Sequence, residues 1–345
     1  MTGPTMTSPL HAAVLKVPAP GFTATVQVPG TSANLGPGFD SLGLAVSLYD
    51  TLSVSTLPSS GQGGGSMDAV LEFDLRGEGV AQLPLDATHL VVKAMDLAFA
   101  RLGYRRGGLR IAAENVLPHG RGLGSSASAI VAGIMAANAL VDSADQQDSQ
   151  WILQLASEME GHPDNVAPAI FGAAAISWRE GQRYASAKVT PSGAVIPVVA
   201  IPNFEVKTEL ARGLLPATVP HADAAANSGR AALLIHALKD APELLGAGTR
   251  DFLHQDYRAA AMPESAALVA KLREDGHAAF ISGAGPTVMA LANGALEADA
   301  MVAFIAGLGG EEKKTSKFGV SWRVLRLAVD LEGAKVEVHP GSQAL

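Results

Sequence analysis

The stretch PHGRGLGSSASA, residues 118–129, places three glycines within five positions directly before a pair of serines. After it, Ile130, Ile134 and Val141 recur at the spacing of one helix face, which predicts a helix that begins near Ser125. The N-terminus of a helix presents unpaired N–H groups and the positive end of the helix dipole, and neighbouring glycines let an anion approach the backbone closely. We therefore expect this loop to bind phosphate groups.

The composition is that of a globular chain large enough for two domains. The 345 residues are 48% hydrophobic and 17% charged, with a net charge of −8. This acidic balance disfavours binding to a nucleic-acid backbone or to an anionic membrane surface. The lack of cysteine excludes disulfides, thiolate nucleophiles and cysteine metal sites. The apolar segments are shorter than the roughly 20 residues of a membrane span, and the first residues do not resemble a secretion signal. We expect a cytoplasmic protein with neither nucleic-acid nor membrane partners.

Strand and helix patterns alternate along the whole chain. Residues 22–28 alternate apolar and polar side chains as a strand does, helical periods follow, and both patterns recur after residue 194. We predict an α+β protein with a flexible N-terminal arm over residues 1–20, a first domain over 21–185 and a second domain over 186–345.

The glycine-rich loop is not a common nucleotide-binding motif of either main kind. A Walker A loop is excluded because the chain has no Gly-Lys-Ser/Thr sequence. Gly122, Gly124 and Ala127 do satisfy the G-x-G-x-x-A pattern of dinucleotide-binding proteins. However, that pattern normally follows the first strand of a βαβ unit, whereas a long strand-rich segment precedes it here.

Three further segments are rich in glycine and polar residues: VPGTSANLGPGFDSLGLAVSLYD (28–50), EGHPDNVAPAIFG (160–172) and FISGAGPTVMAL (280–291). Together with the loop they resemble, in order, the motifs of the GHMP small-molecule kinases, a family that includes galactokinase, homoserine kinase, mevalonate kinase and phosphomevalonate kinase. The first two take the form found in members that phosphorylate homoserine. The resemblance spans residues 22–338, and four ordered motifs make it specific.

The resemblance implies a two-domain GHMP kinase fold. An N-terminal domain like domain 2 of ribosomal protein S5 and a ferredoxin-like C-terminal domain would enclose the active site. The implied reaction is phosphorylation of the side-chain hydroxyl of L-homoserine by ATP with Mg²⁺, giving O-phospho-L-homoserine for threonine biosynthesis. The implied ATP-binding residues are Pro118, Gly120, Arg121, Gly122, Leu123, Gly124, Ser125, Ser126, Ala127, Ser128 and His89. His89 stands where many relatives have an asparagine that contacts adenine, and an imidazole can also form hydrogen bonds.

An amino-acid substrate carries an ammonium and a carboxylate, so its pocket needs an acid and cationic donors. The resemblance assigns the ammonium to Asp40 and the carboxylate to Arg212 and Arg258, because a guanidinium can bind a carboxylate with two parallel hydrogen bonds. Asp164 is the nearest candidate for a catalytic base. The implied substrate-binding residues are Asn34, Asp40, His162, Asn165, Thr208, Arg212, Arg258, Gly283 and Gly285, and the implied catalytic residues are Glu158, Ser126, Asn165 and Asp164.

Ser126 and one glutamate are expected to hold Mg²⁺. Glu158 and Glu160 lie two residues apart, so on a helix their side chains point roughly 200° from one another and only one can face the loop. Glu158 precedes His162 by four residues, a spacing that resembles mevalonate kinase, and it lies at helical spacing from Leu155. We therefore predict that Glu158 and Ser126 are the metal ligands.

Three alternatives remain open at this point. Another GHMP kinase, such as mevalonate kinase or diphosphocytidyl-methylerythritol kinase, would not need Asp40 together with both arginines. An oxidoreductase would use the G-x-G-x-x-A pattern to bind NADH. A non-catalytic regulator would bind ATP without turnover. The sequence leaves open whether the chain forms a homodimer and whether threonine inhibits it.

Overall fold

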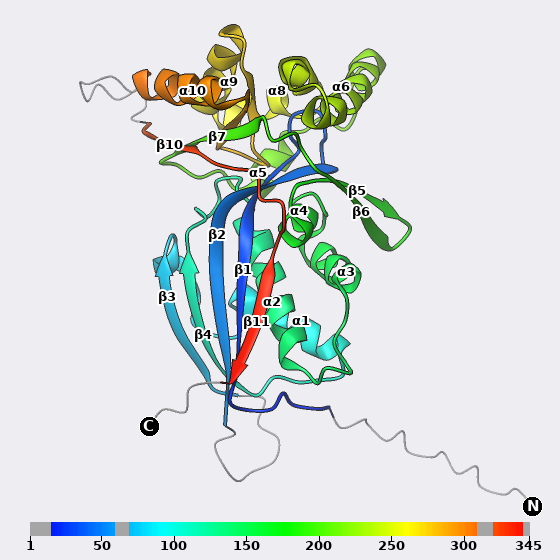
Figure 1. Ribbon diagram of the computed structural model, residues 1–345, viewed down its shortest axis with the longest axis vertical. Coiled ribbons are helices and arrows are strands. Elements are labelled where there is room, and N and C mark those ends of the chain that lie inside the picture. The colour runs from blue at the N-terminus through cyan, green and yellow to red at the C-terminus, as the bar shows by residue number, and fades with distance from the viewer. Residues whose placement is uncertain (1–14, 59–68, 309–319, 341–345) are drawn as a thin grey trace, which may run out of the picture.

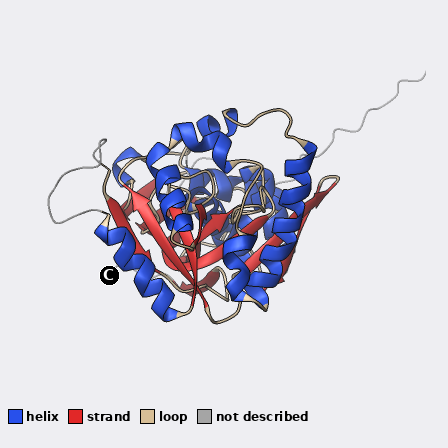
Figure 2. Cartoon of the chain, turned by 90° about the horizontal axis from the view of Figure 1, so that it is seen from above, coloured by secondary structure: helices blue, strands red, loops and turns tan. Residues whose placement is uncertain are grey.

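The computed structural model describes residues 15–58, 69–308 and 320–340. Within these ranges two α+β domains are stacked along the long axis of the molecule, and no helix is long and apolar enough to cross a bilayer (Figure 1). Viewed from above, helices lie over and around the strands (Figure 2).

The first domain is a seven-stranded sheet with helices on one side (Figure 1). The strand order is β11-β1-β2-β4-β3, and β5 pairs with both β2 and β6. The strands are β1 (Phe22–Ala33), β2 (Leu42–Leu57), β3 (Leu71–Gly77), β4 (Gly108–Asn115), β5 (Ala174–Glu180), β6 (Arg183–Val189) and β11 (Lys335–Pro340). The helices are α1 (Leu90–Arg101), α2 (Ser125–Leu140), α3 (Ser149–Glu160) and α4 (Val166–Phe171).

Alternation along the strands gives this sheet one apolar and one polar face. In β1, Val26 and Val28 are fully buried in a core shared with α1 and α2. On the other face the hydroxyls of Thr23 and Ser55 lie 2.8 Å apart on neighbouring strands. The apolar face fixes where α2 packs, and hence where the glycine-rich loop before α2 lies.

The second domain is a four-stranded antiparallel sheet with the order β10-β7-β9-β8. Helices follow β7 and β9, so the chain runs strand, helices, two strands, helix and strand, which is the ferredoxin-like arrangement. The strands are β7 (Val195–Pro202), β8 (Ala278–Ile281), β9 (Val288–Asn293) and β10 (Trp322–Arg326). The helices are α5 (Thr208–Gly213), α6 (His221–Lys239), α7 (Leu245–Gly248), α8 (Gln255–Arg258), α9 (Pro263–Glu274) and α10 (Ala295–Gly307).

The second sheet is buried on both faces, and one of them forms a core shared by the two domains. Val198 and Ala279 pack in a cluster with α9 and α10. Their neighbours Val199 and Phe280 point to the opposite face and pack with α6 and the first domain. The first domain contributes Leu35, Leu42, Leu44, Val46 and Leu123 to this shared core. Because Leu123 belongs to the glycine-rich loop, the packing that joins the domains also holds that loop.

The α+β class predicted from the sequence is confirmed, but the sheets divide the chain differently from the predicted limits. The boundary at residues 185/186 falls inside β6, which pairs with β5 in the first sheet. The chain also returns at its end, because β11 pairs with β1 from Phe22↔Pro340 to Gln27↔Lys335. Hydrophobic periodicity detects a strand but does not reveal which strand it will pair with.

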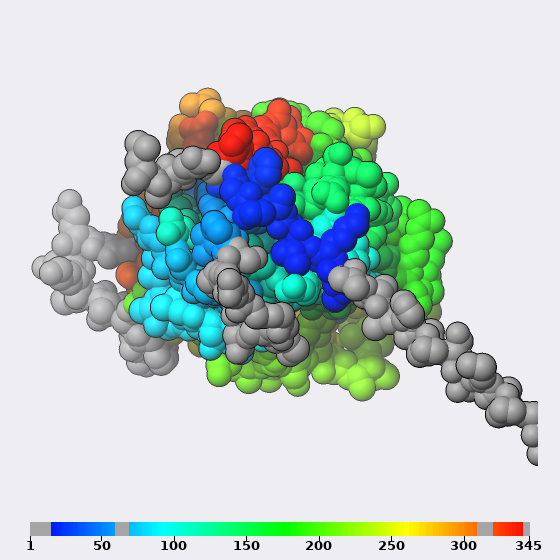
Figure 3. Space-filling view, turned by 90° about the horizontal axis from the view of Figure 1, so that it is seen from below, coloured from blue at the N-terminus to red at the C-terminus, as the bar shows by residue number. Residues whose placement is uncertain are grey.

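The structure does not support a free N-terminal arm at Lys16. Residues 1–14 of the predicted arm lie outside the described residues. The N–H of Lys16 donates to the carbonyl of Gly103 at 3.1 Å, its carbonyl accepts from the N–H of Arg105 at 2.9 Å, and its Nζ lies 2.6 Å from Asp145. Figure 3 shows this start of the described chain spread over the lower end of the first domain.

Phe280 provides a test of the shared core because its side chain is fully buried there. Phe280→Ala is expected to lower the free energy of unfolding by about 3–5 kcal/mol, since it removes apolar contacts and leaves a cavity. Leu296→Ala is the matched control, because Leu296 is 88% exposed and a surface change of this kind costs about 0.5 kcal/mol or less. Urea unfolding measures both values, and equal losses in the two variants would contradict the role given to the shared core.

Candidate active site

The four sequence motifs meet in one cleft between the two domains, with a volume of about 200 Å³. Segments far apart in the sequence form its walls: the loop after β1, the glycine-rich loop before α2, the segment after α3, α5, α8 and the turn between β8 and β9. The lining includes Asn34, Asp40, Pro118, Gly120, Arg121, Gly122, Gly124, Ser125, Ser126, Glu160, His162, Asp164, Asn165, Thr208, Arg212, Arg258, Gly283 and Gly285. The structure therefore brings every predicted substrate-binding residue to this cleft.

The glycine-rich loop needs glycine because of both its backbone angles and its neighbours. Gly120, Gly122 and Gly124 have φ angles of 63°, 74° and 74°, in the region that favours glycine. A Cβ on Gly122 would lie 2.1 Å from the carbonyl oxygen of Ser282, and one on Gly124 would lie 2.0 Å from Oγ1 of Thr31. The α2 helix begins directly afterwards with no side-chain cap, so its first N–H groups remain available to an anion.

Not every residue of the loop faces the cleft. Leu123 and Ala127 are fully buried in the two apolar cores. The hydroxyl of Ser128 donates to Oδ2 of Asp50 at 3.2 Å. The side chains of Leu123 and Ala127 therefore serve packing, and only the backbone of these two residues is left for the predicted contact with ATP. Arg121 reaches the cleft but also donates to the carbonyl of Pro202 at 3.1 Å, so it also ties the loop to the second domain.

Asp50 fixes the position of the loop, and the sequence analysis did not single it out. Its Oδ1 accepts from the N–H groups of Val116 and Leu117 at 2.7 and 2.9 Å, before the loop, and its Oδ2 accepts from Ser128 after the loop. Burial raises the pKa of Asp50, although these hydrogen bonds oppose the rise. Asp50 is the last residue of the quoted 28–50 segment. Its sequence signal is an acidic residue within a predicted strand, which suggests a buried carboxylate with hydrogen-bond partners.

An acid and two guanidinium groups lie at the substrate end of the cleft. Asp40 accepts two hydrogen bonds from Arg212, at 2.7 and 3.1 Å. Arg258 is only 2% exposed, and its Nη1 lies 3.4 Å from the carbonyl of Gly283. The ring of Phe39, another residue that the sequence analysis missed, lies 5.7 Å from the guanidinium carbon of Arg212 and 5.1 Å from that of Arg258. One aromatic ring thus interacts with both cations and partly stabilises their positive charge.

The segment after α3 holds a tight pair of titratable groups. Nδ1 of His162 lies 2.5 Å from Oδ1 of Asp164, which also accepts from the N–H of Asn165 at 3.1 Å. Burial acts to lower the pKa of His162, but the hydrogen bond and the charge of Asp164 outweigh it, so this pKa is raised. Oδ1 of Asn165 accepts from the hydroxyl of Thr31 at 2.9 Å, which joins the segment to β1.

The predicted orientation of Glu158 is wrong, because Glu160 is the glutamate that faces the loop. Oε2 of Glu160 accepts from the hydroxyl of Ser126 at 2.8 Å, and burial is the main cause that raises the pKa of Glu160. Glu158 is exposed and lies 3.0 Å from Nη2 of Arg101 on α1. The spacing argument failed because α3 ends at Glu160 and Gly161 takes a left-handed conformation, so the helical period does not continue to His162.

A second pocket adjoins the first at Ser125 and Ser126, which line both. Its walls are mostly apolar and include Leu52, Leu90, Val91, Ala129 and Ala132, with Asn115, His119 and His89 as polar members. Nδ1 of His89 accepts from the N–H of Val91 at 3.2 Å, and its Nε2 is buried without a partner among the described residues. Burial lowers the pKa of His89, so the neutral ring carries its proton on Nε2 and can donate it to a ligand.

Comparison with known proteins agrees with this geometry. Residues 89–173 match the family described as GHMP kinases N terminal domain, and residues 230–308 match GHMP kinases C terminal. A homoserine kinase of Streptomyces avermitilis is 50% identical over 321 residues, which cover 92% of this chain and 97% of the relative. The crystal structure of homoserine kinase from Cytophaga hutchinsonii has a TM-score of 0.77 at 26% identity, over 91% of this chain and 97% of that one. A putative homoserine kinase from Listeria monocytogenes has a TM-score of 0.68 at 30% identity, over 91% and 99%.

The close approach of Gly122 to Ser282 is testable. Gly122→Ala is expected to weaken binding of a non-hydrolysable ATP analogue at least about tenfold, or about 1.4 kcal/mol, because the new Cβ would force the loop away from the second domain. Gly181→Ala is the matched control, since Gly181 also has a positive φ, of 60°, but no atom within 4 Å of the added Cβ. Isothermal titration of both variants compares the two, and equal affinities would show that the contact does not shape the loop.

Proposed function

Because the chain belongs to the homoserine kinases of the GHMP kinase superfamily, we propose that it transfers the γ-phosphoryl group of ATP to the side-chain hydroxyl of L-homoserine. The observation that carries this proposal is the shared cleft, in which a helix N-terminus suited to phosphate lies beside Asp40, Arg212 and Arg258. The first part suits a nucleotide and the second suits an amino acid.

ATP would occupy both adjoining pockets. Its phosphates would accept hydrogen bonds from the N–H groups of the loop and of the first turn of α2, and from the hydroxyls of Ser125 and Ser126. Its adenine would lie between the apolar walls of the second pocket, where Nε2–H of His89 can donate to a ring nitrogen. The first pocket then remains for the terminal phosphate and the second substrate.

Ser126 and Glu160 form a donor set that fits Mg²⁺. A hydroxyl and a carboxylate are the oxygen ligands that Mg²⁺ prefers, and this ion usually takes only one or two protein ligands together with water and phosphate oxygens. When bound, Mg²⁺ would neutralise charge that develops on the transferred phosphoryl group. The hydrogen bond from the hydroxyl of Ser126 to Oε2 of Glu160 brings these two oxygens within 2.8 Å of each other, so one ion could contact both.

Homoserine would bind as a zwitterion at the other end of the cleft. Its carboxylate would accept from Arg258 and Arg212, and its ammonium would donate to Asp40. Thr208, at the start of α5, and the backbone of Gly283 and Gly285 complete this wall. Asn34 supports it, since its Nδ2 donates to the carbonyl of Gly283 at 2.9 Å.

In the transfer step, the hydroxyl oxygen of homoserine forms a bond to the γ-phosphorus. The bond from this phosphorus to the β,γ-bridging oxygen breaks with its electron pair left on that oxygen, ADP leaves, and the hydroxyl proton passes to solvent water. We propose that positioning matters more than a strong base, as in other phosphoryl transfers with loose transition states. Asp164 supports this view because it is already engaged by His162 and by the N–H of Asn165.

The direct test of the proposed function is ADP release with a panel of acceptors. Homoserine is expected to stimulate Mg²⁺-dependent ADP formation at least about tenfold more than mevalonate, serine, threonine or galactose, since only homoserine combines the zwitterion with a hydroxyl at the right reach. Stimulation by mevalonate alone would instead indicate another member of the superfamily. ATP binding without turnover on any acceptor would indicate a regulator, and binding of NADH an oxidoreductase.

The metal assignment is tested by exchanging each glutamate for its amide. Glu160→Gln is expected to lower kcat by at least about a hundredfold and to raise the Mg²⁺ concentration needed for half-maximal rate, because it removes a charged ligand. Glu158→Gln is the matched control, two residues away on the same helix but exposed beside Arg101. Rates titrated against Mg²⁺ decide between them, and a larger loss in Glu158→Gln would return the metal site to that residue.

A further inference from the structure

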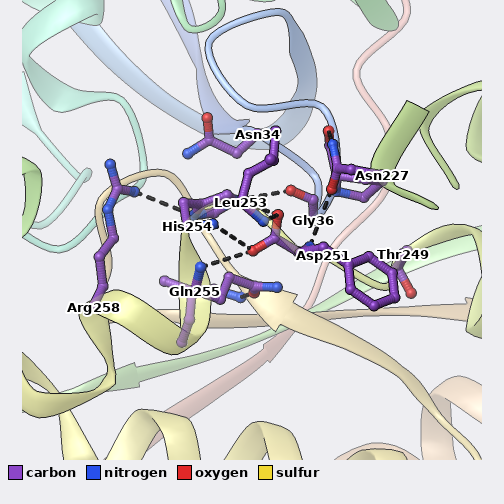
Figure 4. A network of polar contacts seen from close by, with 12 residues as sticks. Asn34, Gly36, Asn227, Thr249, Asp251, Leu253, His254, Gln255 and Arg258 are labelled. Carbon is purple, nitrogen blue, oxygen red and sulfur yellow. Dashed lines mark hydrogen bonds and ion pairs between the residues drawn. The ribbon is translucent and has the colours of Figure 1, made fainter. Parts of the chain in front are cut away.

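A buried polar network joins the loop after β1 to the segment that leads into α8 (Figure 4). Asp251 anchors this network: its Oδ2 accepts hydrogen bonds from the N–H groups of His254 and Gln255 at 3.0 and 2.7 Å. Asn227 of α6 donates to the carbonyl of Pro37 at 2.7 Å and accepts from the N–H of Phe252 at 3.1 Å. These bonds fix the backbone of the loop after β1 and of the segment that leads into α8. The side chain of His254 lies between these two segments.

The surroundings of His254 determine which of its ring nitrogens carries a proton. Its side chain is fully buried, and its Nε2 lies 2.8 Å from the carbonyl oxygen of Gly36. A carbonyl oxygen can only accept, so Nε2 must donate and therefore carries a hydrogen. Burial is the main cause that lowers the pKa of His254, and the charge of Arg258 lowers it further. The nearby carboxylates of Asp251 and Asp40 act to raise this pKa but do not outweigh burial. The ring is therefore neutral, and Nδ1 has a free lone pair.

That lone pair faces the guanidinium of Arg258. Nη1 of Arg258 lies 3.4 Å from Nδ1 of His254, one helical turn earlier in the chain. The ring of Phe39 stacks on His254 with a centroid distance of 5.0 Å and also lies under Arg258, so it limits the movement of both groups. Nε of Arg258 is buried without a partner among the described residues. The direction of the guanidinium therefore depends on the contacts of Nη1, with Nδ1 of His254 and with the carbonyl of Gly283.

We propose that His254 is a positioning residue for Arg258: its neutral ring links the carbonyl of Gly36 to the guanidinium, so that the remaining N–H groups of Arg258 point to the substrate carboxylate. This role requires a donor and an acceptor on opposite edges of one flat ring, with a face for Phe39, and neutral histidine supplies all three. The inference rests on the proposed function, because it takes the carboxylate of homoserine as the partner of Arg258.

Two substitutions separate the contact of His254 with Gly36 from its contact with Arg258. In His254→Gln, the amide nitrogen can reach the position of Nε2 and keep the bond to Gly36, but the acceptor at the position of Nδ1 is lost, and the carbonyl of Gly283 is left to hold Nη1 of Arg258. In His254→Asn, the amide oxygen can take the position of Nδ1 and accept from Arg258, but the bond to Gly36 is lost. We expect His254→Gln to raise the KM for homoserine at least about tenfold with kcat and the KM for ATP within about twofold. His254→Asn should keep the homoserine KM within about threefold and lower Tm instead.

A remote histidine and a double variant provide the controls. His277→Gln should leave all kinetic constants unchanged, because His277 lies between Asp275 and Glu297 and outside the cleft. If His254 acts through Arg258, the double variant His254→Gln with Arg258→Ala should have the same homoserine KM as Arg258→Ala alone.

The outcomes distinguish this inference from the proposed function. An unmodified chain that does not phosphorylate homoserine would overturn the proposed function, and with it the substrate named here. Normal turnover together with an unchanged homoserine KM in His254→Gln would overturn only the role of His254. Parallel losses of homoserine and ATP affinity in both His254 variants would also overturn it, because they would show a general structural effect.

Discussion

Hydrogen bonds among the end of β1, the glycine-rich loop and the turn after β8 hold the two domains together at the cleft. The hydroxyl of Ser282 donates to the carbonyl of Gly122 at 2.6 Å and lies 2.8 Å from the hydroxyl of Ser32, and Asn34 reaches the carbonyl of Gly283. The first strand, the phosphate-binding loop and the turn after β8 are thus hydrogen bonded to one another although they lie up to 250 residues apart. Backbone atoms can approach this closely only where side chains are absent, which is why glycine is required at Gly122.

Residues of both domains line the cleft, so the contact between the domains determines how the two sets of side chains are placed relative to each other. The first domain provides the helix N-terminus with Ser126 and Glu160, and it also provides Asp40. The second domain provides Arg212 and Arg258. A phosphoryl transfer with a loose transition state depends on positioning and charge neutralisation, and a shift of about 1 Å between reacting groups can cost about a hundredfold in rate. The apolar core shared by the domains therefore contributes to catalysis as well as to stability.

The sequence allowed the fold class, the glycine-rich loop before a helix and most of the residues that line the cleft to be predicted, because these depend on local patterns. A run of glycines before a helical period predicts a loop that leads into a helix, and α2 does begin at Ser125. The failures concern relations between distant segments. The pairing of β11 with β1 and the anchoring of the loop by Asp50 depend on contacts that no local window contains. The choice of Glu158 failed for a different reason, since it assumed that the helix continued beyond Glu160.

The charges at the substrate end explain why a zwitterion suits this site. Asp40 is hydrogen bonded to Arg212, whereas Arg258 is almost fully buried and has no acidic hydrogen-bond partner among the described residues, although the charges of Asp40, Asp251 and Asp164 act on it. A buried cation without a partner is costly, and the aromatic ring of Phe39 reduces that cost only partly. A carboxylate ligand would supply the missing negative charge, whereas a neutral alcohol would leave it uncompensated. Asp40 would then share its two oxygens between Arg212 and an ammonium group. The charges of the cleft thus favour an amino acid, and its carboxylate contributes most because it meets Arg258, the more deeply buried of the two cations.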